Sequence, residues 1–469
     1  MLPMSGTVTA RLYAYEMVGG NMGVSANGSS AMEPKLRRYP AFVRFWLAST
    51  VSDFGTYITT LALSVLILVT MNGTPLDQGL VNAARWTPYL LFGLVAGVWI
   101  DRFPRRTVLI GGDLGRGLIL TGVCITAVIG ALSVPTLIIL MFAFGTLALT
   151  SDAAYQSFIP QLVPRSLLIK ANARLQQSDT VAQTTGSAVA GGLVAVMTAP
   201  VALLVDAVSC FFSSAVLLTL ERPSDQARVR SKQALRHKVA EGLRWVYGHS
   251  HLAPLAWSTH LWFIGSAILG AVLPTVILND LRLGALGLGL VMGCSGIGAV
   301  VGTTLSTQLG HRWGTGKAMV AARLAQPFAI ALVALAPLAA GRAHVGETYG
   351  SPLHWPAEVW AAFALAGFGQ LLFGMGMGVE GPLEMGYQQA VTPDKLIARM
   401  SATRRSLNRG MIVIGAPLGG FIATVAGTDT ALWASAAFLL LASLVLLFSR
   451  FREARIEVHQ LSEEEALIP

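Results

Sequence analysis

In "GVWIDRFPRRTVLI", residues 97–110, a group of charged residues separates two long apolar runs. Asp101, Arg102, Arg105 and Arg106 stand here in a chain that is 54% hydrophobic and only 12% charged. Soluble domains carry about 25% charged residues. Charges confined to a short link between apolar runs are typical of a membrane protein whose helices are joined by basic loops. We therefore expect the chain to lie in a lipid bilayer.

Twelve apolar runs are long enough to cross a bilayer, which takes about 20 residues of helix. Within lipid, runs of this length must satisfy their own backbone hydrogen bonds, so they are helices rather than barrel strands. The runs are 42–70, 79–100, 107–130, 135–158, 175–197, 200–220, 253–278, 285–309, 317–340, 359–386, 407–427 and 430–450. The sequence predicts an all-α polytopic membrane protein with twelve transmembrane helices.

Basic residues gather in every second link, which predicts the orientation because cytoplasmic loops are enriched in Lys and Arg. The links on the other side hold only Arg282 and Arg342. The basic links contain Arg102, Arg105 and Arg106; Arg165, Lys170 and Arg174; seven residues between Arg222 and Arg244; Arg312 and Lys317; and Lys395, Arg399, Arg404 and Arg405. We expect an inner or plasma membrane protein with both termini in the cytoplasm.

One inner link is much longer than the others, and it divides the helices six and six. In it, Leu235, Val239, Leu243 and Val246 recur at helical spacing, which predicts an amphipathic helix along the membrane surface. A structural tether is favoured for this helix over a partner-binding role. The expected parts are a disordered cytoplasmic N-terminus at 1–38, six-helix bundles at 39–220 and 253–451, the cytoplasmic linker at 221–252 and a cytoplasmic tail at 452–469. Translation could also begin at Met32, within the polar N-terminus.

The two halves repeat each other. A shift of 228 residues lays "QLVPRSLLIKANARLQQSDTVAQTTGSAVAGGLVA", 161–195, over "QAVTPDKLIARMSATRRSLNRGMIVIGAPLGGFIA", 389–423, without a gap. Matches include Gln161 with Gln389 and Gly191 with Gly419. Duplicated six-helix halves related by an axis along the membrane normal are typical of one class of secondary transporter.

Composition excludes several other functions. The net charge is +9, but the basic residues lie in short links, so a nucleic-acid partner is not expected. The three cysteines, Cys124, Cys210 and Cys294, lie inside apolar runs and do not form a disulfide framework. No nucleophile–base arrangement, phosphate-cradling glycine loop or metal-ligand spacing is present. We expect neither an enzyme nor a cofactor or metal, and we expect a monomer.

The opening stretch resembles the loop signature of the major facilitator superfamily, Gly-x-x-x-Asp-Arg-x-Gly-Arg-Arg. Pro104 replaces its second glycine. "RFWLASTVSDFG", "FIPQLVPRSLLIKANARLQ" and "VDAVSCF" are similar to the branch that contains macrolide-efflux and enterobactin-export proteins, and the resemblance covers roughly 42–450. The resemblance implies two pseudo-symmetric six-helix bundles, the major facilitator fold. The family's antiporter motif is incomplete in the fifth helix, which lacks its proline, and better preserved in the eleventh at Gly415 and Pro417.

The resemblance also implies a cytoplasmic gate. In the family, the loop aspartate lies near the start of the eleventh helix, whose N-terminus attracts a carboxylate. The first arginine of the basic pair bonds an acid at the end of the fourth helix. By position these residues are Asp101, Arg105 and Asp152, with Arg102 and Arg106 beside them. The alternative is that the arginines only set the topology.

The repeat predicts a second, weaker latch in the other half. Shifting Asp152 by 228 residues gives Glu380, at the end of the tenth helix. Its expected partner is Arg312, in "LGHRWGTGK", where the loop signature has decayed. Glu384 lies one helical turn after Glu380 and so on the same face, where it could join the latch or the substrate cavity.

Acidic residues inside the membrane are costly and mark either function or tight pairing. Asp53 lies near the middle of the first helix, which lines the central cavity in this family. Burial disfavours the charged form of a carboxyl group, so Asp53 could exchange a proton at neutral pH. Asp53, Glu380 and Glu384 are the candidates for proton coupling. The alternative for Asp53 is a hydrogen-bonded structural role near Gly55.

The candidates for lining a substrate cavity combine charge with aromatic and methionine side chains. The latter suit varied apolar ligands because they adapt without fixed hydrogen bonds. The candidates are Asp53, Arg85, His260, Trp262, Phe373 and Met377. Arg85 is also a possible partner of Asp53, and a satisfied core histidine is an equal alternative for His260.

Together these features predict a secondary active transporter that exports amphiphilic drug-like compounds by proton antiport with alternating access, a multidrug-resistance function. Its partners would be a small amphiphilic substrate and protons. The rival interpretation is a dedicated exporter of a native metabolite such as a siderophore or lysolipid. A non-transporting membrane sensor is less favoured because the chain carries no sizeable soluble output domain.

Overall fold

The computed structural model describes residues 36–100, 103–221, 235–341, 352 and 355–455. Within them lie twelve helices of 20 or more residues and one shorter helix, α7. The long helices are α1 Pro40–Val65, α2 Pro75–Ile100, α3 Arg105–Val128, α4 Val134–Leu162, α5 Leu168–Met197, α6 Ala199–Thr219, α8 Leu252–Thr275, α9 Gly284–Trp313, α10 Thr315–Ala340, α11 Ala357–Ala390, α12 Asp394–Ala426 and α13 Thr428–Leu447. Eleven of the described helices are long and apolar enough to cross a membrane, and α2, with Asp77, Gln78, Asn82 and Arg85 in its first three turns, is the remaining long one.

Several helices continue beyond the predicted apolar spans. The fifth span was expected to begin at residue 175 and the eleventh at 407, whereas α5 begins at Leu168 and α12 at Asp394. The added turns of α5 carry Lys170, Asn172 and Arg174, which favour water over lipid. Hydropathy therefore locates the segment that crosses lipid, while the helix itself runs on into the polar region.

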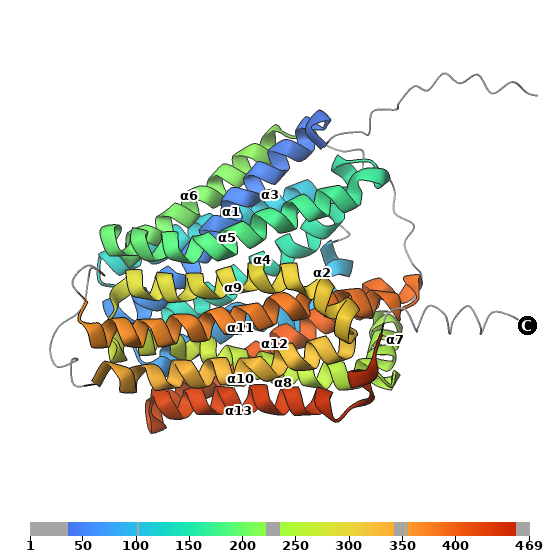
Figure 1. The fold of residues 1–469 in the computed structure, drawn as a ribbon. Coiled ribbons are helices and arrows are strands. Elements are labelled where there is room, and N and C mark those ends of the chain that lie inside the picture. Colours follow the sequence, from blue (N-terminus) through green and yellow to red (C-terminus); the bar gives the residue numbers. More distant parts are fainter. Residues whose placement is uncertain (1–35, 101–102, 222–234, 342–351, 353–354, 456–469) are drawn as a thin grey trace, which may run out of the picture.

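The long helices pack as two groups, α1–α6 and α8–α13, which we call the N-half and the C-half (Figure 1). In the N-half, α1 packs on α5 and α6, and α3 packs on α4 and α6. In the C-half, α11 packs on α9 and α10, and α8 packs on α12 and α13. The halves meet along two helix pairs, α2 with α12 and α5 with α9.

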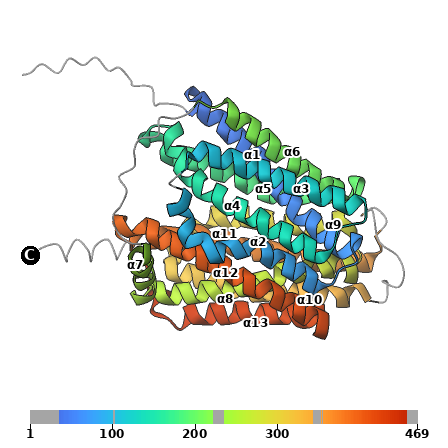
Figure 2. The same cartoon turned by 180° about the vertical axis from the view of Figure 1, so that it is seen from behind.

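The halves are closed at one end and parted at the other. At the end opposite α7, the far end, a single apolar cluster joins both halves and includes Ile67 and Leu68 of the N-half and Ile277 and Leu278 of the C-half. At the end that carries α7, the linker end, the apolar core divides into one cluster for each half. The helices diverge toward the linker end in both views (Figures 1 and 2).

Glycines allow close helix contact at these interfaces. A Cβ atom on Gly420 of α12 would lie 2.3 Å from the backbone oxygen of Pro75 at the start of α2. A Cβ atom on Gly191 of α5 would lie 2.6 Å from the oxygen of Ala285 in α9. Both contacts are near the far end, so small residues there let the two halves approach backbone to backbone.

The α7 helix, Leu235–Gly248, packs on α8 and α12 of the C-half. The indole of Trp245 donates to Thr392 Oγ1 at 3.2 Å, and Glu241 forms an ion pair with Arg399 of α12. The Tyr247 hydroxyl lies 2.5 Å from Nε2 of His260 in α8. These contacts tie α7 to the C-half.

Two matching distortions lie at the far end. A five-residue π-helical turn, η2 (Leu66–Thr70), follows α1, and another, η4 (Val276–Asp280), follows α8. Each is followed two residues later by a residue with a φ of 52°, Asn72 in the N-half and Arg282 in the C-half. The two turns are 210 residues apart, and the same shift relates the loops before α3 and α10. This part of the chain repeats in conformation although its residues differ.

Candidate functional site

Three carboxylates of the N-half form an acidic cluster: Asp53 of α1, Asp152 of α4 and Asp179 of α5. The Tyr57 hydroxyl donates to Asp179 Oδ1 at 3.2 Å, and the Tyr89 hydroxyl donates to Asp152 Oδ2 at 2.7 Å. Asp53 is half-buried and has no hydrogen bond or ion pair among the described residues. Asp53 lies within electrostatic range of Asp179 and Asp152, and also of the guanidinium of Arg116. The cluster thus places an unpaired carboxyl group beside two others.

Arg85 does not pair with Asp53, the partner considered for it. Its guanidinium donates to Thr60 Oγ1 at 3.3 Å. The Cζ atom lies 5.3 Å from the centre of the Phe144 ring and 5.7 Å from that of Trp86. Arg85 is therefore held by a hydroxyl and by ring faces within the N-half.

Two further acids of the N-half are buried and are held by neighbouring groups. Arg116 forms an ion pair with Asp113, one turn earlier on α3, and Ser213 of α6 donates to Asp113 Oδ2 at 2.6 Å. Asp206 of α6 is 1% exposed and accepts from Thr59 of α1 at 2.6 Å. Asp113 is thus ion-paired and hydrogen-bonded, whereas Asp206 is held, among the described residues, by hydrogen bonds alone, and both link α6 to a neighbouring helix.

The C-half contains a buried charge network built around Arg323 of α10, which is 1% exposed. Its Nε donates to Glu380 Oε2 of α11 at 3.0 Å, and its Nη2 donates to Thr259 Oγ1 of α8 at 3.0 Å. Gln326 donates to the other oxygen of Glu380 at 2.8 Å. Glu380 is thus paired with Arg323 rather than with Arg312, which is exposed at the end of α9. The predicted pairing was wrong because it assumed that the partner lay in the link rather than inside the next helix.

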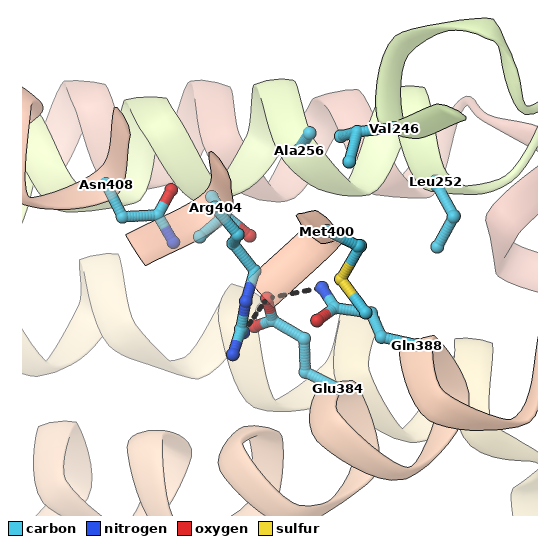
Figure 3. Close-up of a pocket in the computed structure, with 9 residues that line it drawn as sticks. Val246, Leu252, Ala256, Glu384, Gln388, Met400, Arg404 and Asn408 are labelled. Atoms are coloured by element: carbon cyan, nitrogen blue, oxygen red, sulfur yellow. Dashed lines mark hydrogen bonds and ion pairs between the residues drawn. The ribbon is translucent and has the colours of Figure 1, made fainter. Parts of the chain in front are cut away.

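Glu384 continues this network to the linker end (Figure 3). Its Oε2 lies 3.7 Å from Arg323 Nη2, and its Oε1 accepts from Arg404 of α12 at 3.1 Å and from Gln388 at 3.0 Å. The figure shows Arg404 and Gln388 converging on Glu384. The residues that line this pocket are Val246, Leu252, Ala256, Thr259, Glu384, Gln388, Met400, Arg404 and Asn408. The pocket lies under α7, between α8, α11 and α12.

The aromatic candidates lie beside the network. The rings of Trp262 and Phe373 stack with centroids 6.3 Å apart and planes 4° apart, and the Trp262 indole donates to Gln326. Met377 packs against the apolar core near them. His260 is 7% exposed and meets Tyr247 of α7, so it faces the linker helix.

In the part of the chain that the structure describes, the charged side chain of Arg409 reaches from the C-half to the N-half. The Cζ atom of Arg409, on α12, lies 4.1 Å from the centre of the Trp86 ring and 5.6 Å from that of Tyr89, both on α2. Tyr89 is the residue that donates to Asp152. Arg409 therefore connects the C-half to the acidic cluster through an aromatic pair.

The predicted cytoplasmic gate is incompletely described, because Asp101 and Arg102 lie outside the described residues. Arg105 donates to Ser157 Oγ at 2.7 Å, and Arg106 donates to the backbone oxygens of Leu217 and Leu218. The described contacts do not include the predicted pair between Arg105 and Asp152. The gate stays a prediction. Its described residues lie at the linker end, where the two halves are apart.

A family model described as "Transmembrane secretion effector" matches residues 13–350. The chain belongs to this family. Membership makes it a membrane-embedded secondary transporter of the major facilitator type, and not an enzyme, as predicted.

The relatives of this secretion-effector transporter include the two groups expected from its sequence. It is 24% identical over 387 residues to the enterobactin exporter EntS of Salmonella paratyphi A, covering 82% of this chain and 86% of that protein. It is 25% identical over 193 residues to macrolide efflux protein A of Streptococcus pyogenes, covering 40% of this chain and 47% of that protein. The nucleoside transporter NupG superposes with a TM-score of 0.69 at 11% identity, over 87% of this chain and 99% of NupG. The predicted major facilitator fold is confirmed.

Sequence reasoning misses three residues that organise this transporter: Asp179, Arg323 and Arg409. Each is a charged residue inside a segment that otherwise reads as a transmembrane helix. A charged residue inside an apolar span is the signal that pointed to Asp53. The same signal, applied to every span, also finds Arg323 within 317–340. It would not have shown which group each residue faces.

Proposed function

We propose that this transporter exports small amphiphilic, drug-like molecules by alternating access, driven by protons that enter in exchange. The observation that carries the proposal is the state of Asp53. It is half-buried in the middle of α1, lies within electrostatic range of Asp179 and Asp152, and has no hydrogen bond or ion pair among the described residues. A carboxyl group in this position can bind either a proton or a positively charged substrate, which is the competition that antiport requires.

Glu380 and Glu384 are less suited to proton exchange than Asp53. Both oxygens of Glu380 accept hydrogen bonds, and its charge balances the buried guanidinium of Arg323. Protonating it would break the closer of the two ion pairs of Arg323 and leave only the 3.7 Å contact with Glu384. Loss of one partner of a buried pair costs about 3–5 kcal/mol. Glu384 is held by Arg323, Arg404 and Gln388. We assign both glutamates to holding α10, α11 and α12 together.

The closed far end and parted linker end fit an alternating-access cycle. The basic links lie at the linker end, so we place that end, and both termini, in the cytoplasm. The conformation is then one that opens inward and can load substrate from the cytoplasm or inner leaflet. The gate residues Asp101, Arg102, Arg105, Arg106 and Asp152 would meet the C-half, Arg312 included, when this end closes.

The experiment that tests the proposal measures uptake into inverted membrane vesicles under an imposed pH gradient, with a panel of cationic, neutral and anionic amphiphiles. Asp53→Asn should lose gradient-driven uptake of the transported compound by at least about tenfold, since an amide cannot carry the proton. It should retain exchange of labelled for unlabelled substrate, which needs no proton. Asp429→Asn, an exposed carboxylate at the start of α13, is the matched control. Equal gradient-driven uptake in the wild type and Asp53→Asn would remove Asp53 from the mechanism.

A second function, export of an anionic native metabolite such as a siderophore, is favoured by Arg409. Its guanidinium has no ion pair among the described residues and lies where the two halves meet. An anionic ligand between the halves would meet this charge. The substrate panel should therefore include a catecholate siderophore and a lysolipid. Uptake of the siderophore that is lost in Arg409→Gln but kept in Asp53→Asn would select this second function.

A further inference from the structure

The contact between Arg409 and the pair Trp86–Tyr89 joins a cation of one half to two aromatic faces of the other. The two ring centroids are 5.2 Å apart and the ring planes meet at 56°, so the rings form two tilted walls. Arg409 Cζ is nearer to Trp86, at 4.1 Å, than to Tyr89, at 5.6 Å. Both distances lie within the range of about 6 Å over which a ring face attracts a cation.

The rings hold Arg409 without the help of a paired carboxylate. Arg323 and Arg404 of the same half each contact a glutamate, whereas Arg409 makes no ion pair among the described residues. Among the described contacts, Arg409 is linked to an acid only indirectly: it contacts the Tyr89 ring, and the Tyr89 hydroxyl donates a hydrogen bond to Asp152. That bond fixes the Tyr89 ring and makes it a better partner for a cation, because its hydroxyl donates to an anion.

Nothing in this arrangement requires the cation to belong to the protein. A quaternary ammonium or phosphonium group meets the same ring faces and the same acidic field, and aromatic walls are the usual recognition element for such groups. Arg85 also lies 5.7 Å from the centre of the Trp86 ring, farther than Arg409, and its guanidinium is held by Thr60 and by the Phe144 ring.

We propose that Trp86 and Tyr89 form a binding subsite for an organic cation, and that Arg409 occupies it as a tethered competitor from the opposite half. The proposal rests on the proposed export function and names its substrate class. A bound cation displaces Arg409 and releases α12 from α2 midway along their interface. Substrate binding is thereby coupled to the contact between the halves.

The test is the binding of tetraphenylphosphonium to the full-length transporter purified in detergent, measured by equilibrium dialysis. Arg409→Gln should bind this cation about five- to tenfold more tightly than the wild type, because the competitor is gone. Triphenylphosphine oxide, of similar shape but neutral, should change by less than about twofold, and its unchanged binding also reports that the variant is folded. Arg409→Lys should fall between the wild type and Arg409→Gln, since an ammonium stacks less well on rings.

Two further variants separate the subsite from a general loss of positive charge. Arg405→Gln removes the same charge from an exposed position one turn away on α12 and should leave tetraphenylphosphonium affinity unchanged. Adding Trp86→Leu to Arg409→Gln should abolish the gain. The proposal is overturned if Arg409→Gln fails to bind the cation more tightly, if Arg405→Gln gains as much, or if the gain survives the loss of Trp86.

This measurement uses no gradient and no vesicles, so it does not depend on proton coupling. Failure of Asp53→Asn to change transport would refute the antiport mechanism and leave the subsite standing. Conversely, an unchanged affinity in Arg409→Gln would refute the subsite while the antiport proposal could still hold.

Discussion

In the N-half, Arg116 pairs with an acid of its own helix, Asp113, whereas in the C-half Arg323 has no acid on α10 and reaches Glu380 and Glu384 of α11. The two arrangements occupy related places. The 210-residue shift that relates the loops before α3 and α10 carries Asp113 to Arg323 and Arg116 to Gln326. At the matching positions 113 and 323 the sign of the charge is therefore exchanged, whereas Arg116 matches a neutral glutamine.

This exchange decides which carboxylates are left unpaired. The acid of α11, Glu380, is bound by the arginine of α10. Its counterpart in the N-half, Asp152 of α4, receives only a tyrosine hydroxyl, because Arg116 is already neutralised on its own helix. Asp53 and Asp179 are two further carboxyl groups on that side. The buried network of the C-half therefore matches two arginines with two glutamates, and the N-half keeps acids without a cationic partner among the described residues.

The largest loss of stability is expected when the central residue of the C-half network, Arg323, is replaced. Arg323→Met should destabilise the transporter by about 3–5 kcal/mol, because it leaves two buried glutamates without their shared partner. Thermal unfolding in detergent, followed with a dye that reacts with the buried thiols of Cys124 and Cys210, measures the loss. Adding Glu380→Gln should recover part of it. A double variant as unstable as the sum of the two single variants would contradict the pairing.

A smaller loss of stability is expected from a change in helix packing within the C-half. A Cβ atom on Gly374 of α11 would lie 1.9 Å from the backbone oxygen of Ser295 in α9. Gly374→Ala should therefore destabilise the C-half by about 2 kcal/mol, since neither backbone can yield easily. Gly381, on the same helix, has open space at its Cβ position. Gly381→Ala should be neutral or slightly stabilising in the same thermal assay, and similar losses for the two variants would argue against close α9–α11 contact.

The smallest effect is expected at the local pair of the N-half. Ser213→Ala removes one hydrogen bond to Asp113 but leaves its ion pair with Arg116, so it should cost about 1 kcal/mol. Because this pair lies on one helix, the loss should not alter tetraphenylphosphonium binding between the halves. A loss as large as that of Arg323→Met would mean that the N-half pair is not self-sufficient.

The sequence was a good guide to the helices and to the positions of acids, and a poor guide to their partners. The 228-residue repeat located Glu380 from Asp152 correctly, because the repeat preserves depth along a helix. It assigned Glu380 to Arg312, because the loop signature was the nearest source of positive charge. Most of these helices are apolar on all faces, so periodicity does not say which way a lone charged residue points. Helix packing decides which groups the side chains of Arg323 and Arg409 contact, and a local sequence pattern does not predict that packing.

The paired π-helical turns η2 and η4 carry a consequence for the history of the chain. A π turn arises where one residue is inserted into a regular helix, and here it stands at matching sites in both halves. A single insertion in an ancestral half, copied when that half was duplicated, accounts for both. Deleting one residue from either turn should restore an ordinary helical turn and rotate the segment beyond it by about 100°. The altered half would then lack the π turn that the other half keeps.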